Sequence, residues 1–182
     1  MRVISGTARG LKLESLDGLS TRPTLDRVKE SIFNMLFDKT IDSYVLDLFA
    51  GSGAMGIEAL SRMSSHCTFV DCEQKAINIV KNNISRARFE QKSTVINSDF
   101  EKFLTTTTDK YDIVFVDPPY DAGFVPRVLD IIYERCLLND DAIVVVETSK
   151  NVNPCISNNY NVIKHKSYGK VDVYLLEAIW IK

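Results

Sequence analysis

The chain has 182 residues and an apolar content of 45%, which is enough for one well-buried core and too little for two ordinary domains. No run approaches the roughly 20 apolar residues that cross a bilayer, and the N-terminal residues lack the apolar centre of a signal peptide, so we predict a cytoplasmic protein without membrane contact. The formal net charge of −2 excludes the overall basic excess that is typical of a small nucleic-acid-binding domain.

Charge is nevertheless distributed unevenly along the chain. Residues 1–12 carry Arg2, Arg9 and Lys12 and no acid, whereas residues 99–148 hold eleven acids against four bases, a sum of −7. A basic arm beside an acidic body suits contacts with phosphate groups. The alternative is a solvated tail whose charge is incidental.

An amphipathic helix is predicted ahead of the first strand. Thr24 stands where a capping residue would begin it. Apolar residues at helical spacing then form one face that we expect to pack on the core, namely Leu25, Val28, Ile32, Met35 and Leu36.

From Tyr44 onward, short apolar runs rich in β-branched residues alternate with segments of helical period. This alternation predicts βαβ units and a doubly wound parallel sheet. The expected strands are 44–49, 67–71, 93–97, 111–117 and 142–147, and the expected helices are 54–63, 74–87 and 124–134. The segments 105–108 and 151–161 are predicted to be surface loops.

The C-terminal residues depart from this alternation. Two strand-like runs, 161–166 and 171–181, are joined by only four residues, and so short a connection requires an antiparallel hairpin. A mostly parallel seven-stranded α/β sheet that ends in a hairpin is expected of Rossmann-like methyltransferases and not of nicotinamide dehydrogenases.

The four cysteines form no CxxC pair, and only two histidines could assist them in binding a metal. We therefore predict buried, reduced thiols and no metal site. The cysteines are Cys67, Cys72, Cys136 and Cys155.

A glycine-rich turn follows the first predicted strand, in the sequence Asp-Leu-Phe-Ala-Gly-Ser-Gly-Ala-Met-Gly that begins at Asp47. Gly51 and Gly53 allow the backbone to approach a ligand closely, while Asp47 can accept a hydrogen bond from a cationic amino group. The spacing up to Gly56 also fits a dinucleotide-binding turn, so the glycines indicate a nucleotide ligand without naming the reaction.

Acidic residues end the next two strands. Asp71, about twenty residues beyond the glycines, is placed to bind both ribose hydroxyls of a nucleoside, with Glu73 as the alternative. Asp99 ends the third strand and is expected either to bind an adenine amino group or to cap the following short helix. The cofactor-binding set also includes Phe49 and Phe100.

The sequence Asp117-Pro118-Pro119-Tyr120 follows the fourth strand and should face the nucleotide site, because ligands bind beyond the carboxyl ends of parallel strands. Two prolines fix the backbone and remove two N–H donors, which leaves carbonyl oxygens and one carboxylate. Such an array accepts hydrogen bonds from a planar amino group, and Tyr120 can stack on the attached ring. These four residues are the predicted catalytic set, and a rigid turn without catalytic function is the alternative.

This tetrapeptide resembles the signature of amino-nitrogen methyltransferases. Over nearly its full length the chain is similar to the RsmD-type ribosomal RNA guanine-N2 methyltransferases. The matching motifs include Arg-Val-Ile-Ser-Gly from Arg2, Arg-Pro-Thr from Arg22, Leu-Phe-Ala-Gly-Ser-Gly from Leu48 and Phe-Val-Asp-Pro-Pro-Tyr from Phe115.

The resemblance implies S-adenosylmethionine as methyl donor and a guanine N2 in bacterial small-subunit ribosomal RNA, free or partly assembled, as acceptor. We predict a monomer in which residues 1–40 are an arm and helix that contact RNA and residues 41–182 are the methyltransferase domain. The candidate RNA-binding residues are Arg2, Arg9, Lys12, Arg22 and Arg27. The rival functions are an amino-methyltransferase acting on DNA adenine or cytosine, or on another RNA, and a non-catalytic nucleotide-binding module.

Overall fold

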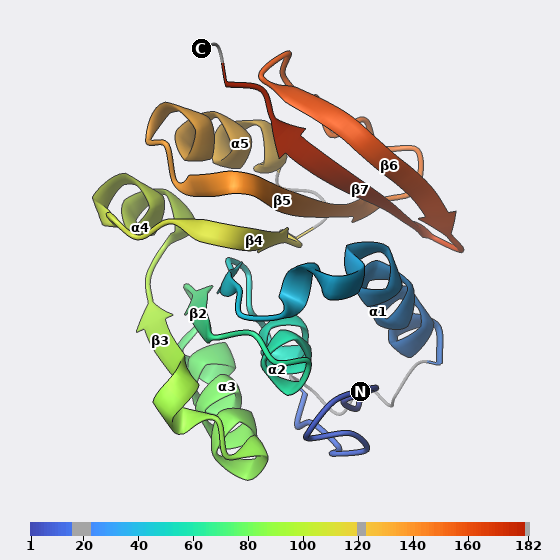
Figure 1. Cartoon of the computed structure of the whole chain (residues 1–182), viewed down its shortest axis with the longest axis vertical. Helices are drawn as coiled ribbons and strands as arrows, with labels where there is room; N and C mark the ends of the chain where they lie inside the picture. Colours follow the sequence, from blue (N-terminus) through green and yellow to red (C-terminus); the bar gives the residue numbers. More distant parts are fainter. Residues whose placement is uncertain (16–22, 120–122, 181–182) are drawn as a thin grey trace.

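A computed structural model describes residues 1–15, 23–119 and 123–180, with the side chains of 23–25 outside the description. A single seven-stranded sheet runs through the molecule in the order β3-β2-β1-β4-β5-β7-β6 (Figure 1). Neighbouring strands from β3 to β5 are parallel, and β7 is antiparallel to both β5 and β6. The strands are β1 (Tyr44–Asp47), β2 (His66–Asp71), β3 (Ser93–Asn97), β4 (Tyr111–Val116), β5 (Leu138–Ser149), β6 (Tyr160–Tyr168) and β7 (Val171–Ala178).

Helices cover both faces of the sheet, and a separate apolar cluster fills each face. The cluster on one face contains side chains from α1 (Pro23–Leu36), α2 (Ala54–Ser61) and α3 (Gln74–Ala87). The cluster on the other face contains side chains from α4 (Phe100–Thr106) and α5 (Val125–Glu134). Successive residues of a strand point to opposite faces, and β1 shows this directly because Val45 belongs to the first cluster and Leu46 to the second.

The α/β fold with a doubly wound sheet and a C-terminal hairpin is confirmed. The boundaries differ where sheet pairing extends beyond the apolar runs. β5 begins four residues before the predicted Ala142, because Leu138 pairs with Tyr111 of β4, and it ends at Ser149, which pairs with Val171 of β7. β7 ends at Ala178, three residues before the predicted end.

Two helix predictions are wrong in detail. The helix α1 begins at Pro23, so Thr24 lies inside it and is not its cap. The predicted loop 105–108 is partly helical, since α4 extends to Thr106. The hydroxyls of Thr105 and Thr106 donate to the carbonyl oxygens of Glu101 and Lys102 one turn earlier, which satisfies them within the helix.

The prediction of buried cysteines holds only for Cys67, whereas Cys72, Cys136 and Cys155 are exposed, and all four are free thiols. The three exposed residues lie in loops or turns outside the apolar runs on which the prediction was based. Across the described ranges, every helix falls short of the length and apolar character that a bilayer crossing requires.

Residues 1–13 fold back on themselves and pack against the core. The N–H of Val3 donates to Leu11 O at 2.9 Å, and the N–H of Leu13 donates to Met1 O at 3.0 Å. Both Val3 and Leu13 are buried in the cluster beside α1 and α2. This segment, which we call the arm, is therefore packed as part of the folded structure.

Candidate functional site

A cavity of about 530 Å³ lies at the carboxyl ends of the parallel strands. Residues that follow β1, β2, β3 and β4 line it, as the topology of a doubly wound sheet requires. It brings together nine of the predicted cofactor and catalytic residues, namely Phe49, Gly51, Asp71, Glu73, Asp99, Phe100, Asp117, Pro118 and Pro119.

The glycine turn is held by Asp71. Gly51 and Gly53 have φ values of 54° and 75°, in the left-handed region that favours glycine. The Asp71 carboxylate accepts from Gly51 N at 2.8 Å through Oδ2 and from Glu73 N at 2.9 Å through Oδ1. Asp71 thus links the turn after β1 to the end of β2. Because Asp71 and Glu73 both line the cavity, either can accept hydrogen bonds from ribose hydroxyls.

Asp99 caps α4, the alternative that the sequence left open. Its Oδ1 accepts from Glu101 N at 2.9 Å and from Lys102 N at 3.3 Å. Because Asp99 also lines the cavity, capping fixes the carboxylate at the cavity wall.

Three aromatic rings form an apolar wall beside these acids. Phe100 lies 5.5 Å from Phe49 and 5.0 Å from Phe124, measured between ring centroids. Phe49 and Phe124 are nearly parallel at 6.3 Å. Phe124 was missed as a site residue, since it follows the Asp-Pro-Pro-Tyr motif at the start of a helix and nothing in its spacing marks it.

Asp117 lies where two cavities meet. It lines the 530 Å³ cavity and also a smaller cavity of about 170 Å³. Desolvation by nearby protein atoms raises the pKa of Asp117 above its ordinary value. Asp117 keeps exposure to solvent, which moderates that shift. Tyr120 lies outside the described residues.

Asp47 does not line the larger cavity, where the sequence placed it, but the smaller one. It is buried, and its Oδ2 accepts from Gly56 N at 2.9 Å in the first turn of α2. Burial raises the pKa of Asp47 to about 7; the Gly56 hydrogen bond opposes this, while the nearby charges of Asp117 and Asp71 add to it. Gly53 lines neither cavity.

The smaller cavity contains a third acid that the sequence analysis did not select. Glu147 near the end of β5 lines it together with Asp47 and Asp117. The sequence did contain a signal for it. Glu147 is the last residue of the predicted strand 142–147, just as Asp71 is the last residue of the predicted strand 67–71.

The larger cavity is strongly anionic. Four carboxylates, from Asp71, Glu73, Asp99 and Asp117, line it, and no lysine or arginine does so among the described residues. Such a site favours a ligand that presents hydroxyl and amino donors and positive charge, and it disfavours the pyrophosphate of a dinucleotide.

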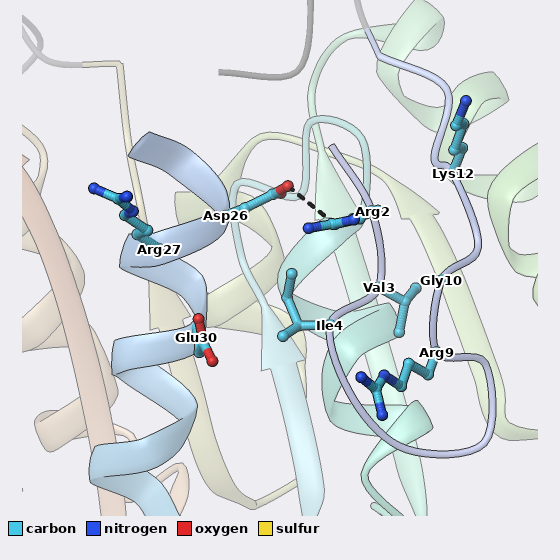
Figure 2. A pocket seen from close by; sticks show the side chains of 9 residues that line it. All are labelled: Arg2, Val3, Ile4, Arg9, Gly10, Lys12, Asp26, Arg27 and Glu30. Carbon is cyan, nitrogen blue, oxygen red and sulfur yellow. Dashed lines mark ion pairs between the residues drawn. The ribbon is translucent and has the colours of Figure 1, made fainter. Parts of the chain in front are cut away.

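A cationic cavity of about 700 Å³ lies between the arm and α1 (Figure 2). Four predicted RNA-binding residues line it with two acids: Arg2, Arg9, Lys12 and Arg27 with Asp26 and Glu30. Figure 2 shows Arg2 reaching from the arm toward Asp26 of α1, where Nε lies 3.6 Å from the carboxylate. The fifth candidate, Arg22, is outside the described residues.

A buried carboxylate fixes the arm to α2. Glu58 accepts from Ile4 N at 2.8 Å and from Ser5 N at 3.0 Å. It also pairs with Lys29 of α1 at 3.0 Å and with Arg62 at 2.8 Å, and Lys29 and Glu58 are almost fully buried. Lys29 in turn donates to Arg2 O at 2.6 Å, so one charge network joins the arm, α1 and α2.

Known proteins resemble the chain over nearly its whole length. The family model described as Conserved hypothetical protein 95 matches residues 1–177. YlbH of Bacillus subtilis (strain 168) is 40% identical over 95% of this chain and 96% of its own. The Ribosomal RNA small subunit methyltransferase D of Escherichia coli (strain K12) is 34% identical over 94% of this chain and 86% of its own.

The solved structure of yhhF from Escherichia coli superposes with a TM-score of 0.86 at 33% identity and covers 98% of this chain and 97% of that one. Sequence and structure thus agree over the arm, the sheet and the C-terminal hairpin, which confirms the RsmD-type resemblance. The chain belongs to the Conserved hypothetical protein 95 family.

Proposed function

We propose that the protein transfers a methyl group from S-adenosylmethionine to the exocyclic N2 amino group of a guanine in bacterial small-subunit ribosomal RNA. One observation carries the proposal: the segment Asp117-Pro118-Pro119 lines the anionic cavity and also its neighbours. Asp117 lines the 170 Å³ cavity as well, and the two prolines line a third cavity. A donor on one side and an amino group on the other would meet at this segment. The relative named Ribosomal RNA small subunit methyltransferase D supports the choice of substrate.

The larger cavity fits S-adenosylmethionine by its chemistry. The ribose hydroxyls, adenine amino group and cationic methionine end of that molecule are donors or positive charges, and the cavity offers four carboxylates. We assign the ribose to Asp71 and Glu73, and the adenine to Asp99 and the aromatic wall of Phe49 and Phe100. When bound, the molecule supplies an electrophilic methyl group.

The chain's own contribution is to orient a weak nucleophile. The lone pair of a guanine amino nitrogen is delocalised into the ring. If Asp117 and the carbonyl oxygen of Pro118 each accept one N–H bond, the nitrogen is drawn toward tetrahedral geometry and its lone pair toward the methyl group. As the bond between nitrogen and the methyl carbon forms, positive charge develops on the nitrogen. The hydrogen bond from the amino group to Asp117 then strengthens. Its raised pKa makes Asp117 a better acceptor for the proton that the nitrogen then loses.

We assign the RNA backbone to the cationic cavity of the arm and α1. Arg2, Arg9, Lys12 and Arg27 would contact phosphates, and the target base would be flipped out or lie in a loop to reach Asp117. On this proposal residues 1–40 serve RNA binding, residues 41–182 perform the transfer, and the protein acts as a cytoplasmic monomer on free or partly assembled ribosomal RNA.

The rival functions make different use of the same features. A DNA amino-methyltransferase would share Asp117, but a relative that matches 94% of this chain is named for ribosomal RNA. A non-catalytic nucleotide-binding module has no use for the Asp-Pro-Pro segment between the cavities.

Methyl acceptance decides among these functions. The enzyme and S-adenosylmethionine are incubated with each of three acceptors: deproteinised ribosomal RNA, small subunits from a strain lacking this gene, and duplex DNA. Each acceptor is then digested for mass spectrometry of its nucleosides. We expect N2-methylguanine from ribosomal RNA or subunits. Methyladenine or methylcytosine in DNA would favour the first rival, and cofactor binding without transfer to any acceptor would favour the second.

A further inference from the structure

Resting on the proposed function, we infer that the end of the β6–β7 hairpin is a second contact site for the RNA backbone, separate from the arm. Three lysines make up this site, which we call the hairpin tip: Lys150, Lys166 and Lys170. None of them belongs to the RNA-binding set predicted from the sequence, and none lines the cationic cavity beside the arm.

The sheet brings the hairpin tip to the edge where the anionic cavities lie. Strand β5 is parallel to β4 and ends at Ser149, which pairs with Val171 at the start of β7. Val171 also pairs with Tyr168, the last residue of β6. The turn between β6 and β7 therefore stands at the carboxyl ends of the parallel strands. Lys150 belongs to the same corner, because its N–H donates to Lys170 O at 2.8 Å.

The pairing register directs Lys166 to the face of the sheet that carries α1. Lys166 pairs with Val173 and Tyr168 pairs with Val171, and both valines belong to the apolar cluster beside α1. Side chains of directly paired residues lie on the same face of a sheet. The Tyr168 hydroxyl shares a hydrogen bond with the Ser31 hydroxyl of α1, which agrees with this direction.

The helix α1 connects the hairpin tip with the cationic cavity. Ser31 lies one turn after Arg27, and residues four apart lie on the same side of a helix. Arg27 lines the cationic cavity together with Arg2 and Arg9 of the arm. In Figure 1, α1 lies between the arm and the β6–β7 turn. A phosphate-binding surface that begins at the arm can therefore continue across α1 to the hairpin tip.

The charge of the hairpin tip is not neutralised by the acids around it. The three lysines are exposed, and none forms an ion pair with another described residue. Strand β6 contains no acid, and Glu177 of β7 pairs with Asn161 at the opposite end of the hairpin. Asp172 is 4% exposed and already accepts from Asn151 N at 3.1 Å and from the Ser167 hydroxyl. The lysines therefore present net positive charge, which suits phosphate groups.

Protection of the sheet edge is the alternative role for these charges. Strand β6 is an edge strand, and lysines on an exposed edge prevent pairing with other chains. That role accounts for Lys164 and Lys166, which lie on β6. It does not account for Lys150 and Lys170, which lie outside the strands in the turns at the active-site edge. Phosphate binding accounts for all three lysines of the hairpin tip.

The salt dependence of RNA binding tests the inference. The acceptor, free ribosomal RNA or small subunits, is whichever one wild type methylates. K166Q/K170Q should raise its dissociation constant about tenfold near 0.1 M salt and make the salt dependence shallower by about one unit of slope per lost phosphate contact. Addition of K150Q should extend both changes. The matched control is K92Q/K110Q, which removes the same charge from exposed lysines before β3 and β4, at the opposite edge of the sheet.

The difference between the two double variants is the decisive quantity. For K166Q/K170Q, kcat/KM for the acceptor should fall with the affinity, whereas K92Q/K110Q should stay close to wild type in both. Melting temperature and cofactor affinity report that the variants are folded. Equal changes in the two variants, or self-association of K166Q/K170Q in sedimentation with unchanged RNA binding, would overturn the inference and leave the proposed function standing. If wild type methylates neither acceptor, the proposed function fails, and the inference that rests on it fails too.

Discussion

The arm and the strand ends carry opposite charges. Around the arm, four cationic side chains and two acids line a wide cavity that suits phosphates. At the ends of β1 to β5, carboxylates line two cavities that suit amino and hydroxyl donors, with Lys29 as the one cationic side chain among the described residues that line them. A phosphate carries no base identity, so the cationic region would hold the RNA in position while the anionic region selects and activates the base.

The two regions are also held by different means. A buried charge network joins the arm to α1 and α2, whereas backbone hydrogen bonds to Asp71, Asp99 and Asp47 hold the strand-end acids. Substitutions can therefore be made in either region. Those in the arm and its charge network should change stability and RNA affinity, and those at the strand ends should change cofactor affinity and catalysis.

The largest expected effect is on stability, at Glu58. Glu58→Ala leaves Lys29 buried without its partner and frees two N–H groups of the arm, so unfolding free energy should fall by about 3–5 kcal/mol. Urea denaturation measures it. The double variant Glu58→Met with Lys29→Met removes both charges and should lose less. Equal losses in the two would show that charge pairing does not hold the arm.

Asp71→Ala should weaken S-adenosylmethionine by about 1.5–3 kcal/mol, the range for hydrogen bonds to a charged group. The structure gives Asp71 a second task in holding Gly51 N, so part of this loss would come from the turn. Calorimetry of Asp71→Ala beside Glu73→Ala separates the two roles. Unchanged affinity in the first and a loss in the second would assign the ribose to Glu73 alone.

The anionic region should also reveal itself through pH. Burial raises the folded-state pKa of Asp47 to about 7, above the unfolded value near 3.8. The contribution of Asp47 to the free energy of unfolding is therefore fully present below pH 3.8 and is lost as pH rises through about 7. Asp47→Asn should therefore gain stability relative to wild type as pH rises across that window, by up to about 4 kcal/mol. Thermal unfolding at pH 4, 6 and 8 measures the difference, and a difference independent of pH would show that Asp47 stays ionised.

The smallest effect is expected in the arm. Arg9→Gln with Lys12→Gln should raise the RNA dissociation constant and make the salt dependence shallower by about one unit of slope per lost phosphate contact. Binding titrations across salt concentrations measure this, with Lys102→Gln on α4 as control. A change in kcat at saturating RNA would contradict a purely positioning arm.

The fold followed from local signals, but several site features did not. Runs such as Ile113–Val116 predicted buried strands, and four residues between two runs predicted the hairpin. The pairing of Glu58 with Ile4 and Lys29 joins positions up to 54 residues apart, which no local pattern encodes.

The roles of single acids were hardest to predict. Asp47 was chosen because it precedes the glycine turn, and Asp71 and Asp99 because they end strands. Each also accepts a backbone N–H that the sequence could not pair with it. Whether a strand-end acid serves the fold, the ligand or both depends on the backbone around it. Glu147 met the same criterion and was overlooked.

The rate of methyl transfer by Asp117→Ala tests the central claim most directly. Removing the acceptor between the cavities should lower kcat on ribosomal RNA by roughly 10²–10³-fold, the scale for one preorganised electrostatic group, while cofactor and RNA dissociation constants change little. Asp117→Asn keeps an acceptor oxygen and should be milder. A folded Asp117→Ala enzyme that methylates ribosomal RNA at a near wild-type rate would contradict the account.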